Sequence, residues 1–187
     1  RGSPDPAGRA GISLHQDAGG RGHAAFGEPT AGGQDHARLP GRADLPALAF
    51  TERVVKESLR LHAPIWAFNR TPKQPTTIGG YDVAPGDLVL ISPTILHTQE
   101  RYFARPLSFE PERFAEPSHP RHAYLPFGAG PHVCIGAQFA VQEMVLVLAT
   151  IASRYRLVLS PGQRVEAAAL VSLRPKRPVR IELVRRA

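Results

Sequence analysis

The chain contains one cysteine, Cys134, in a glycine-rich loop directly before a long apolar helix pattern. The loop reads FGAGPHVCIG from Phe127 to Gly136 and has glycines on both sides of the cysteine. Glycine permits backbone angles that other residues avoid, and it has no side chain that would obstruct a flat ligand. The first amides of the following helix, predicted from about Ala137 to Ser153, favour a thiolate. We therefore interpret Cys134 as a thiolate presented to a metal by this segment, the cysteine loop.

A plainer interpretation exists, because a lone cysteine is more often a small buried hydrophobic residue. That alternative does not account for the glycines, for the two prolines Pro126 and Pro131, or for the helix that begins directly after the loop. A single cysteine also excludes a disulfide framework within one chain, which suits a reducing compartment.

The stretch FGAGPHVCIGAQFA resembles the haem-binding loop of the cytochrome P450 monooxygenases. The family pattern is Phe, two residues, Gly, one residue, a basic residue, one residue, Cys, one residue, Gly; its positions are filled here by Phe127, Gly130, His132, Cys134 and Gly136. The resemblance implies that the Cys134 thiolate is the axial ligand of haem iron, with Phe127 packed near it as a shield. The basic residue is usually an arginine that pairs with a haem propionate. A histidine can donate to a propionate but is only partly charged near neutral pH.

Further haem contacts follow from the resemblance. Gly128, Gly136 and Ala140, the last at a small-residue position that usually follows the loop, are expected against the cofactor. Arg70 and His97 are expected haem-propionate contacts, because charge-assisted hydrogen bonds to carboxylates suit such side chains. Taken alone, both have plainer interpretations, since an exposed arginine usually only increases solubility and a histidine in a loop usually binds no ligand.

Glu57 and Arg60 in KESLR are three residues apart on a strongly helical segment and therefore share one face. Alone, such a pair is usually solvated and contributes well under about 1 kcal/mol. In the family that the chain resembles, however, the helix glutamate and arginine form a buried network with the arginine of a PERF segment, which here contains Arg113. The resemblance implies a structural role for all three residues in holding the cysteine loop, and it identifies no catalytic residue beyond the haem ligand.

The chain has two unlike parts. Residues 1–42 are dominated by Gly, Ala, Arg and Pro, so we expect this segment to be disordered or not to be native family sequence, as from a shifted reading frame. Residues 43–187 are expected to form the C-terminal haem-binding part of a cytochrome P450 domain, with a mixed α/β, mainly α fold. Its expected order is a helix carrying Glu57, small β-sheets, a meander, the cysteine loop, the long helix and a terminal hairpin.

Local patterns predict the boundaries of several elements. Asp44 is expected to be the N-cap of a helix that runs to Leu61. Pro85 and Gly86 suit the centre of a type II turn. Short strands are expected from Trp66 to Arg70, Thr76 to Ile78, Tyr81 to Val83 and Leu88 to Ser92, and a closing hairpin from Val171 to Arg174 and Val179 to Val184.

The formal net charge of +7 raises the alternative of nucleic-acid binding. Basic residues are concentrated after residue 173, but no aromatic residue that could stack on bases accompanies them. We therefore expect no nucleic-acid partner and instead a solvated surface that could attract an acidic electron-transfer protein. No apolar run reaches the roughly eighteen residues of a membrane span, and no apolar signal-peptide core is present at the start. No membrane association is expected, and the cytoplasm is the expected location.

The resemblance implies insertion of one oxygen atom from O2 into a small organic substrate by a haem (iron protoporphyrin IX) enzyme. Electrons from NAD(P)H would arrive through a ferredoxin or a flavoprotein reductase. The family's helix that lines the oxygen pocket with an acidic residue and a threonine has no counterpart here, so we expect little or no activity from this chain alone. Two alternatives remain: a haem-binding remnant or sensor without catalysis, and a basic binding module in which the loop resemblance is accidental.

Overall fold

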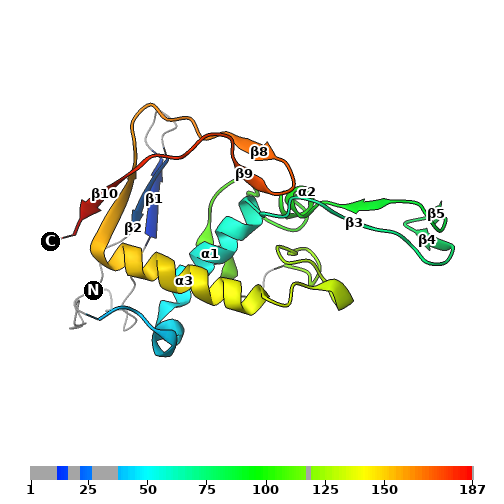
Figure 1. Cartoon of the computed structure of the whole chain (residues 1–187), viewed down its shortest axis with the longest axis horizontal. Helices are drawn as coiled ribbons and strands as arrows, with labels where there is room; N and C mark the ends of the chain where they lie inside the picture. Colours follow the sequence, from blue (N-terminus) through cyan, green and yellow to red (C-terminus); the bar gives the residue numbers. More distant parts are fainter. Residues whose placement is uncertain (1–11, 17–21, 27–37, 117–118, 187) are drawn as a thin grey trace, which may run out of the picture.

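The computed structural model describes residues 12–16, 22–26, 38–116 and 119–186. Its centre consists of two helices, α1 (Ala49–Leu61) and α3 (Ala137–Arg154), which pack against each other (Figure 1). Small two-stranded sheets and long loops surround them, and the described fold is therefore mixed α and β. None of the helices in the described residues is long and apolar enough to span a membrane.

Apolar residues of helix α1 recur at helical spacing and are buried, as are its charged residues Glu57 and Arg60. The buried apolar residues of α1 are Val54, Val55 and Leu59. From α3, Val145 and Ala149 are buried, and Val145 joins Val55 and Leu59 in the core. The partly buried residues packed against that core are Leu45, Leu48, Phe127, Val141, Met144 and Leu148. The cysteine loop is thus tied to the core through Phe127.

The expected helix start at Asp44 is wrong. A 3-10 helix, η1 (Arg42–Leu48), precedes α1, and its N-cap is Gly41. The Asp44 carboxylate accepts hydrogen bonds from the Gly41 amide at 2.6 Å and from Arg38 at 2.7 Å, so it acts from within the first turn. Pro46 lies inside η1 and has no amide to donate, which favours a short 3-10 segment before the α-helix begins.

The expected strands between the two helices are confirmed, two of them shortened at the ends. Strand β3 (Phe68–Arg70) pairs with β6 (Val89–Ile91), and β4 (Thr76–Ile78) pairs with β5 (Tyr81–Val83), both antiparallel. In Figure 1 these strands extend away from the helices to the right. The turn at Pro85 and Gly86 is also present. Gly86 has φ +97°, and the Asp87 amide donates to the Ala84 carbonyl at 3.1 Å.

Three short helical elements lie in the segment between the sheets and α3. Helix α2 (Pro93–His97) begins at Ser92, whose hydroxyl accepts from the Ile95 amide at 3.3 Å. The 3-10 helix η2 (Pro111–Phe114) carries Arg113 in the meander, and η3 (Gly130–His132) lies inside the cysteine loop. These elements place the meander beside α1 and the cysteine loop next to the start of α3.

The expected closing hairpin is wrong. Strand β10 (Ile181–Arg185) pairs with β7 (Tyr155–Leu159), which follows α3 directly, whereas β9 (Leu173–Pro175) pairs with β8 (Ala167–Ala169). The two segments expected to pair with each other therefore lie in different sheets. Alternation along a strand predicts which side chains share a face, but it does not identify the partner strand.

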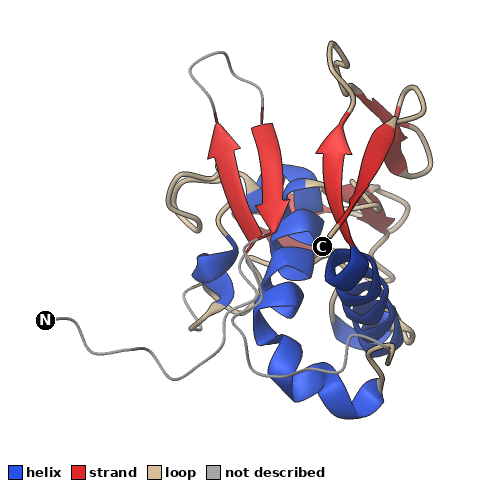
Figure 2. Cartoon of the chain, turned by 90° about the vertical axis from the view of Figure 1, so that its left-hand side faces the viewer, coloured by secondary structure: helices blue, strands red, loops and turns tan. Residues whose placement is uncertain are grey.

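The N-terminal segment contains a further antiparallel pair, β1 (Ile12–Gln16) and β2 (Gly22–Phe26). Both cartoons show this pair on the same side of the helices as β7 and β10 (Figures 1 and 2). Of residues 1–42, which were expected to be disordered or not native family sequence, the structure describes these two strands and residues 38–42, and that expectation stays a prediction. The remaining residues of that segment lie outside the described part of the chain.

Candidate functional site

Backbone hydrogen bonds shape the cysteine loop. The Gly128 amide donates to the Leu125 carbonyl at 3.2 Å, and the Cys134 amide donates to the Phe127 carbonyl at 3.0 Å. Gly128 and Gly130 have φ of +76° and +70°, in the left-handed region that a side chain disfavours. The loop conformation therefore requires glycine at both positions and closes Cys134 back onto Phe127.

The loop delivers the cysteine sulfur to the start of α3. Gly136 is the N-cap residue of α3, and a Cβ built on it would lie 3.9 Å from the Cys134 Sγ. The Ala137 amide donates to the Cys134 carbonyl at 3.2 Å. Cys134 is a free, exposed thiol and not a core residue. The alternative of a buried structural cysteine is therefore wrong.

A cavity of about 530 Å³ opens beside the sulfur. It brings Cys134, His132, Gly128 and Phe127 of the cysteine loop together with Arg70 of β3, which lies more than fifty residues earlier in the chain. Five of the expected site residues thus share one cavity, the Cys134 pocket. The other residues that line it are Ile65, Phe68, Asn69, Thr71, Leu125 and Pro126.

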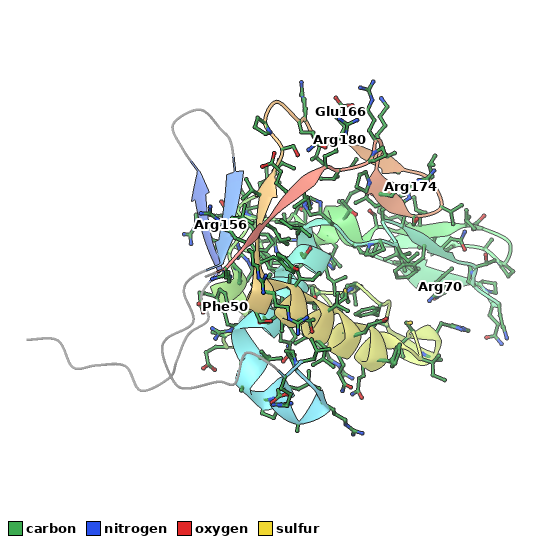
Figure 3. All side chains as sticks on the ribbon, turned by 60° about the vertical axis from the view of Figure 1, so that its left-hand side comes forward. Phe50, Arg70, Arg156, Glu166, Arg174 and Arg180 are labelled. Carbon is green, nitrogen blue, oxygen red and sulfur yellow. The ribbon has the colours of Figure 1, made fainter. Side chains whose placement is uncertain are left out.

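Arg70, labelled in Figure 3, lines the pocket from strand β3. Its guanidinium lies over the Phe68 ring, 4.9 Å from the centroid, and donates to the Asn69 carbonyl at 2.7 Å. A guanidinium has five N–H donors, and these contacts use one of them. Arg70 and the exposed His132 can therefore both offer donors to an anionic group in the pocket.

Gly136 and Ala140, two of the expected haem contacts, do not line the pocket. Both lie at the start of α3, where the Ala140 amide donates to the Gly136 carbonyl at 2.9 Å. Gly136 still contributes to the site, because its missing side chain leaves space beside the Cys134 sulfur.

The structure also places His97 outside the pocket. Its side chain is fully buried, with Nδ1 3.0 Å from the Arg60 carbonyl oxygen and Nε2 2.8 Å from the Leu125 amide nitrogen. Burial lowers the pKa of His97 to about 4. Both ring nitrogens are occupied by backbone groups and the ring is neutral near pH 7, so the expected propionate contact at His97 is corrected.

The structure brings Glu57, Arg60 and Arg113 together. Arg60 forms two hydrogen bonds to the Glu57 carboxylate, Nε to Oε2 at 2.7 Å and Nη2 to Oε1 at 2.9 Å. Arg113 Nε donates to Glu57 Oε1 at 3.0 Å, and the Glu110 amide donates to the same oxygen at 2.8 Å. The Glu57 and Arg60 side chains are both 0% exposed, so the solvated surface pair considered above is excluded.

This Glu57–Arg60–Arg113 network also anchors the meander. Arg60 donates to three carbonyl oxygens, those of His97 at 2.8 Å, Pro106 at 2.7 Å and Ser108 at 3.1 Å. A buried charge is tolerated where such partners replace water. The network therefore fixes the chain from α2 to η2 against α1.

Two groups of residues were not expected from the sequence. The apolar side of the pocket, including Ile65 and Phe68, neighbours Arg70 in the chain, but no local pattern shows that these residues meet the cysteine loop. Tyr124 was not expected either; it is half-buried, its hydroxyl donates to the Lys56 carbonyl at 3.0 Å, and burial raises its pKa. The local sequence around Tyr124 offers only an aromatic residue shortly before the cysteine loop, followed two residues later by a proline. Both features are too common in sequences to identify such contacts.

The pocket fits a haem group by its chemistry and its shape. A thiolate is a suitable iron ligand, and Arg70 and His132 suit carboxylates at the edge of a flat cofactor. Gly128 lines the pocket and has no side chain to fill it, and a Cβ built on Gly136 would lie 3.9 Å from the Cys134 Sγ. The cavity volume is in the range of pockets that bind small molecules and cofactors.

Comparisons with known proteins agree with this fit. The family model described as cytochrome P450 matches residues 33–182. The chain is 43% identical over 139 residues to cyclooctatin synthase of Streptomyces melanosporofaciens, across 73% of this chain and 30% of that protein. It is 40% identical to cyclooctat-9-en-7-ol 5-monooxygenase of the same organism, across 81% and 32%, and 39% identical to human cytochrome P450 4V2, across 76% and 28%.

A solved structure shows the same fold. A crystal structure of the cytochrome P450 CYP102L1 superposes with a TM-score of 0.71 and 31% sequence identity, covering 81% of this chain and 35% of that one. The chain thus spans about a third of the length of the curated relatives it matches. The extent of the family match, the sequence identities and the shared fold lead to one conclusion: the chain belongs to the cytochrome P450 family.

Proposed function

We propose that this chain is the haem-binding part of a cytochrome P450 monooxygenase and that Cys134 supplies the axial thiolate ligand of the haem iron. The observation that carries the proposal is the Cys134 pocket, in which the exposed thiol shares one cavity with Arg70 and His132. The bound haem would supply the activation of O2 for oxidation of an organic substrate. Membership of the family supports the enzyme class and the cofactor.

The chain's own residues would bind and orient the cofactor. Arg70 from β3 and His132 from η3 would donate hydrogen bonds to its carboxylates. Phe127 lines the pocket and also contacts the core, so it would cover the Cys134 sulfur and limit the access of water. The Glu57–Arg60–Arg113 network would hold the meander against α1. It would thereby also position the segment of the chain that leads into the cysteine loop.

The activity of a whole protein is a separate proposal, since the matched part covers only about a third of the relatives' own length. We propose a small organic substrate and electrons from NAD(P)H delivered by a ferredoxin or a flavoprotein reductase. An acidic partner would suit the exposed basic residues of the C-terminal segment, of which Figure 3 labels Arg174 in β9 and Arg180 directly before β10. Location in the cytoplasm stays a prediction.

The axial ligand can be tested by spectroscopy on the full chain. The chain is loaded with haem, reduced and exposed to carbon monoxide. A thiolate ligand gives a strongly red-shifted absorption band, a histidine ligand gives an ordinary band, and a chain that binds no haem gives none. We expect the red-shifted band for the wild type and its loss in Cys134→Ser. An unchanged spectrum in Cys134→Ser would overturn the assignment.

A second measurement separates an enzyme from a haem-binding remnant or sensor. Consumption of NAD(P)H and formation of oxidised product are measured with a reductase and a panel of small organic compounds. We expect haem binding with little or no turnover from this chain alone, because the family's oxygen-pocket helix has no counterpart in its sequence. Turnover at the rate of a whole family member would contradict that expectation.

A further inference from the structure

His97 lies where three segments meet. It is the last residue of α2 and is fully buried, and its ring is packed against two aromatic rings. The Tyr124 ring lies 5.3 Å from it, and the Phe103 ring lies 6.3 Å away, edge-on at 77°. A histidine buried to this extent needs hydrogen-bond partners for both ring nitrogens.

The two partners determine the tautomer. Nε2 lies 2.8 Å from the Leu125 amide, which can only donate, so Nε2 must be the acceptor. Nδ1 lies 3.0 Å from the Arg60 carbonyl oxygen, which can only accept, so Nδ1 must carry the proton. The arrangement therefore requires a neutral imidazole protonated at Nδ1, and it uses both of its hydrogen-bonding atoms.

His97 and Arg60 also hold each other in both directions. The His97 ring donates to the Arg60 carbonyl, and the Arg60 guanidinium donates to the His97 carbonyl at 2.8 Å. Arg60 is in turn fixed by the Glu57 carboxylate. The backbone at the end of α1 and the imidazole ring are thus placed relative to each other by three buried residues.

The other side of the ring leads to the cysteine. Leu125 directly precedes Pro126 and lines the Cys134 pocket. Its carbonyl accepts from the Gly128 amide at 3.2 Å, and the Phe127 carbonyl accepts from the Cys134 amide at 3.0 Å. A displacement of the Leu125 backbone would therefore move the segment to which the cysteine is hydrogen-bonded.

We propose that His97 is a positioning residue for the haem ligand. It connects the Glu57–Arg60–Arg113 network to the cysteine loop through the hydrogen bond that the Leu125 amide donates to its Nε2. The inference rests on the proposed function for its relevance to haem, but the hydrogen bond itself can be measured without the cofactor.

Three substitutions at His97 separate the effects of the two hydrogen bonds that its imidazole ring makes. In His97→Gln, the side-chain Oε1 occupies the place of Nε2 and can still accept from Leu125. In His97→Asn, the side-chain Nδ2 occupies the place of Nδ1 and can still donate to the Arg60 carbonyl, but nothing reaches Leu125. In His97→Phe, the ring packing is retained and both bonds are lost.

The first readouts need no haem. Nitrogen-15 NMR of the wild-type chain reports which ring nitrogen carries the proton, and amide hydrogen exchange reports the protection of the Leu125 amide. We expect the proton on Nδ1 and a protected amide. In His97→Asn and His97→Phe the protection should fall by about tenfold or more, and in His97→Gln it should stay within about threefold of the wild type.

The last readout is the reduced carbon monoxide spectrum of the haem-loaded proteins. Asn and Phe variants should convert part of the red-shifted band to the ordinary one, whereas Gln should retain it, a rescue that a purely space-filling role does not predict. A proton on Nε2 in the wild type, or an unprotected Leu125 amide, would overturn the proposal. Equal spectral loss in the Gln and Asn variants would also overturn it.

Failure of the proposed function and failure of a variant to fold can both be told apart from failure of this proposal. If the wild type gives no red-shifted band, the proposed function fails, while the tautomer and the exchange of Leu125 still decide the role of the hydrogen bond. If His97→Asn does not fold by circular dichroism, the wild-type measurements and His97→Gln carry the test.

Discussion

At the scale of single residues, Glu57 determines more of the site's geometry than any exposed charge. Its carboxylate accepts four hydrogen bonds: two from Arg60, one from Arg113 and one from the Glu110 amide. Burial of such a group contributes little net stability compared with a well-packed apolar residue, but removal of its charge leaves the fully buried Arg60 guanidinium without its counter-ion, whereas Arg113 keeps its ion pair with Glu110. The network therefore specifies one arrangement of α1 and the meander.

This leads to a prediction for Glu57→Gln. The neutral amide cannot balance the buried guanidinium of Arg60, so the free energy of unfolding should fall by about 3–5 kcal/mol in urea titrations. Glu52→Gln on the same helix is the matched control. It removes a half-exposed ion pair with Lys56 and should cost only about 0.3–0.5 kcal/mol. Similar losses in both variants would show that burial of the pair has no consequence.

The glycines of the loop give a second prediction. Gly128 has φ +76° and lines the pocket, whereas Gly162 has φ +72° and lies in a turn remote from it. Alanine at either position should cost about 1–2 kcal/mol of stability through the left-handed backbone. Only Gly128→Ala should also weaken haem binding in a titration followed by absorbance. Equal haem affinity in the two variants would argue against contact between the loop backbone and the cofactor.

At the scale of elements, the sequence predicts those helices, turns and loops that depend on residues close together in the chain. The helices around Glu57 and after Cys134, the turn at Gly86 and the cysteine loop each have a local signal, and the structure contains all of them. The pairing of β7 with β10 and the position of His97 depend on segments far apart in the chain. Spacing along one segment carries no information about such contacts, so these features could not be predicted.

The junction of α1, α2 and the cysteine loop should be sensitive to acid. Burial holds the pKa of His97 near 4, below its ordinary value of 6.5, so the folded state excludes a proton that the unfolded chain binds. Stability from this group is fully present above about pH 6.5 and is lost as the pH falls toward 4, by on the order of 2–3 kcal/mol. The hydrogen bond to the Arg60 carbonyl raises the pKa of His97 again, whereas charge repulsion from Arg60 and His119 lowers it, and burial remains the largest cause.

The measurement is the urea midpoint between pH 7.5 and 4. We expect it to fall in the wild type and to fall less steeply in His97→Gln, which has no group to protonate at this position. Burial also lowers the pKa of His62 and of His119, so some acid dependence should remain in the variant. Identical slopes in the two proteins would show that His97 is not the main titrating group.

At the scale of the whole molecule, the described residues combine a small core with exposed apolar side chains. The buried apolar residues are Val54, Val55, Leu59, Ala63, Phe103, Ala123, Val145 and Ala149. Beside Cys134, by contrast, Ile135 is 104% exposed, and Phe139 at the start of α3 is 72% exposed. Large apolar side chains grouped on a surface favour association with another surface.

Ile135→Gln and Phe139→Gln should therefore separate stability from association. Both side chains already face solvent, so the free energy of unfolding should change by less than about 0.5 kcal/mol, while self-association in sedimentation velocity should decrease. Val145→Ala on the buried face of the same helix is the counterpart. Its loss of two core methyl groups should cost on the order of 2 kcal/mol and leave association unchanged. A large loss of stability in the glutamine variants would mean that Ile135 and Phe139 pack against other residues of the chain. These side chains near Cys134 would then be part of the core and not of an exposed surface.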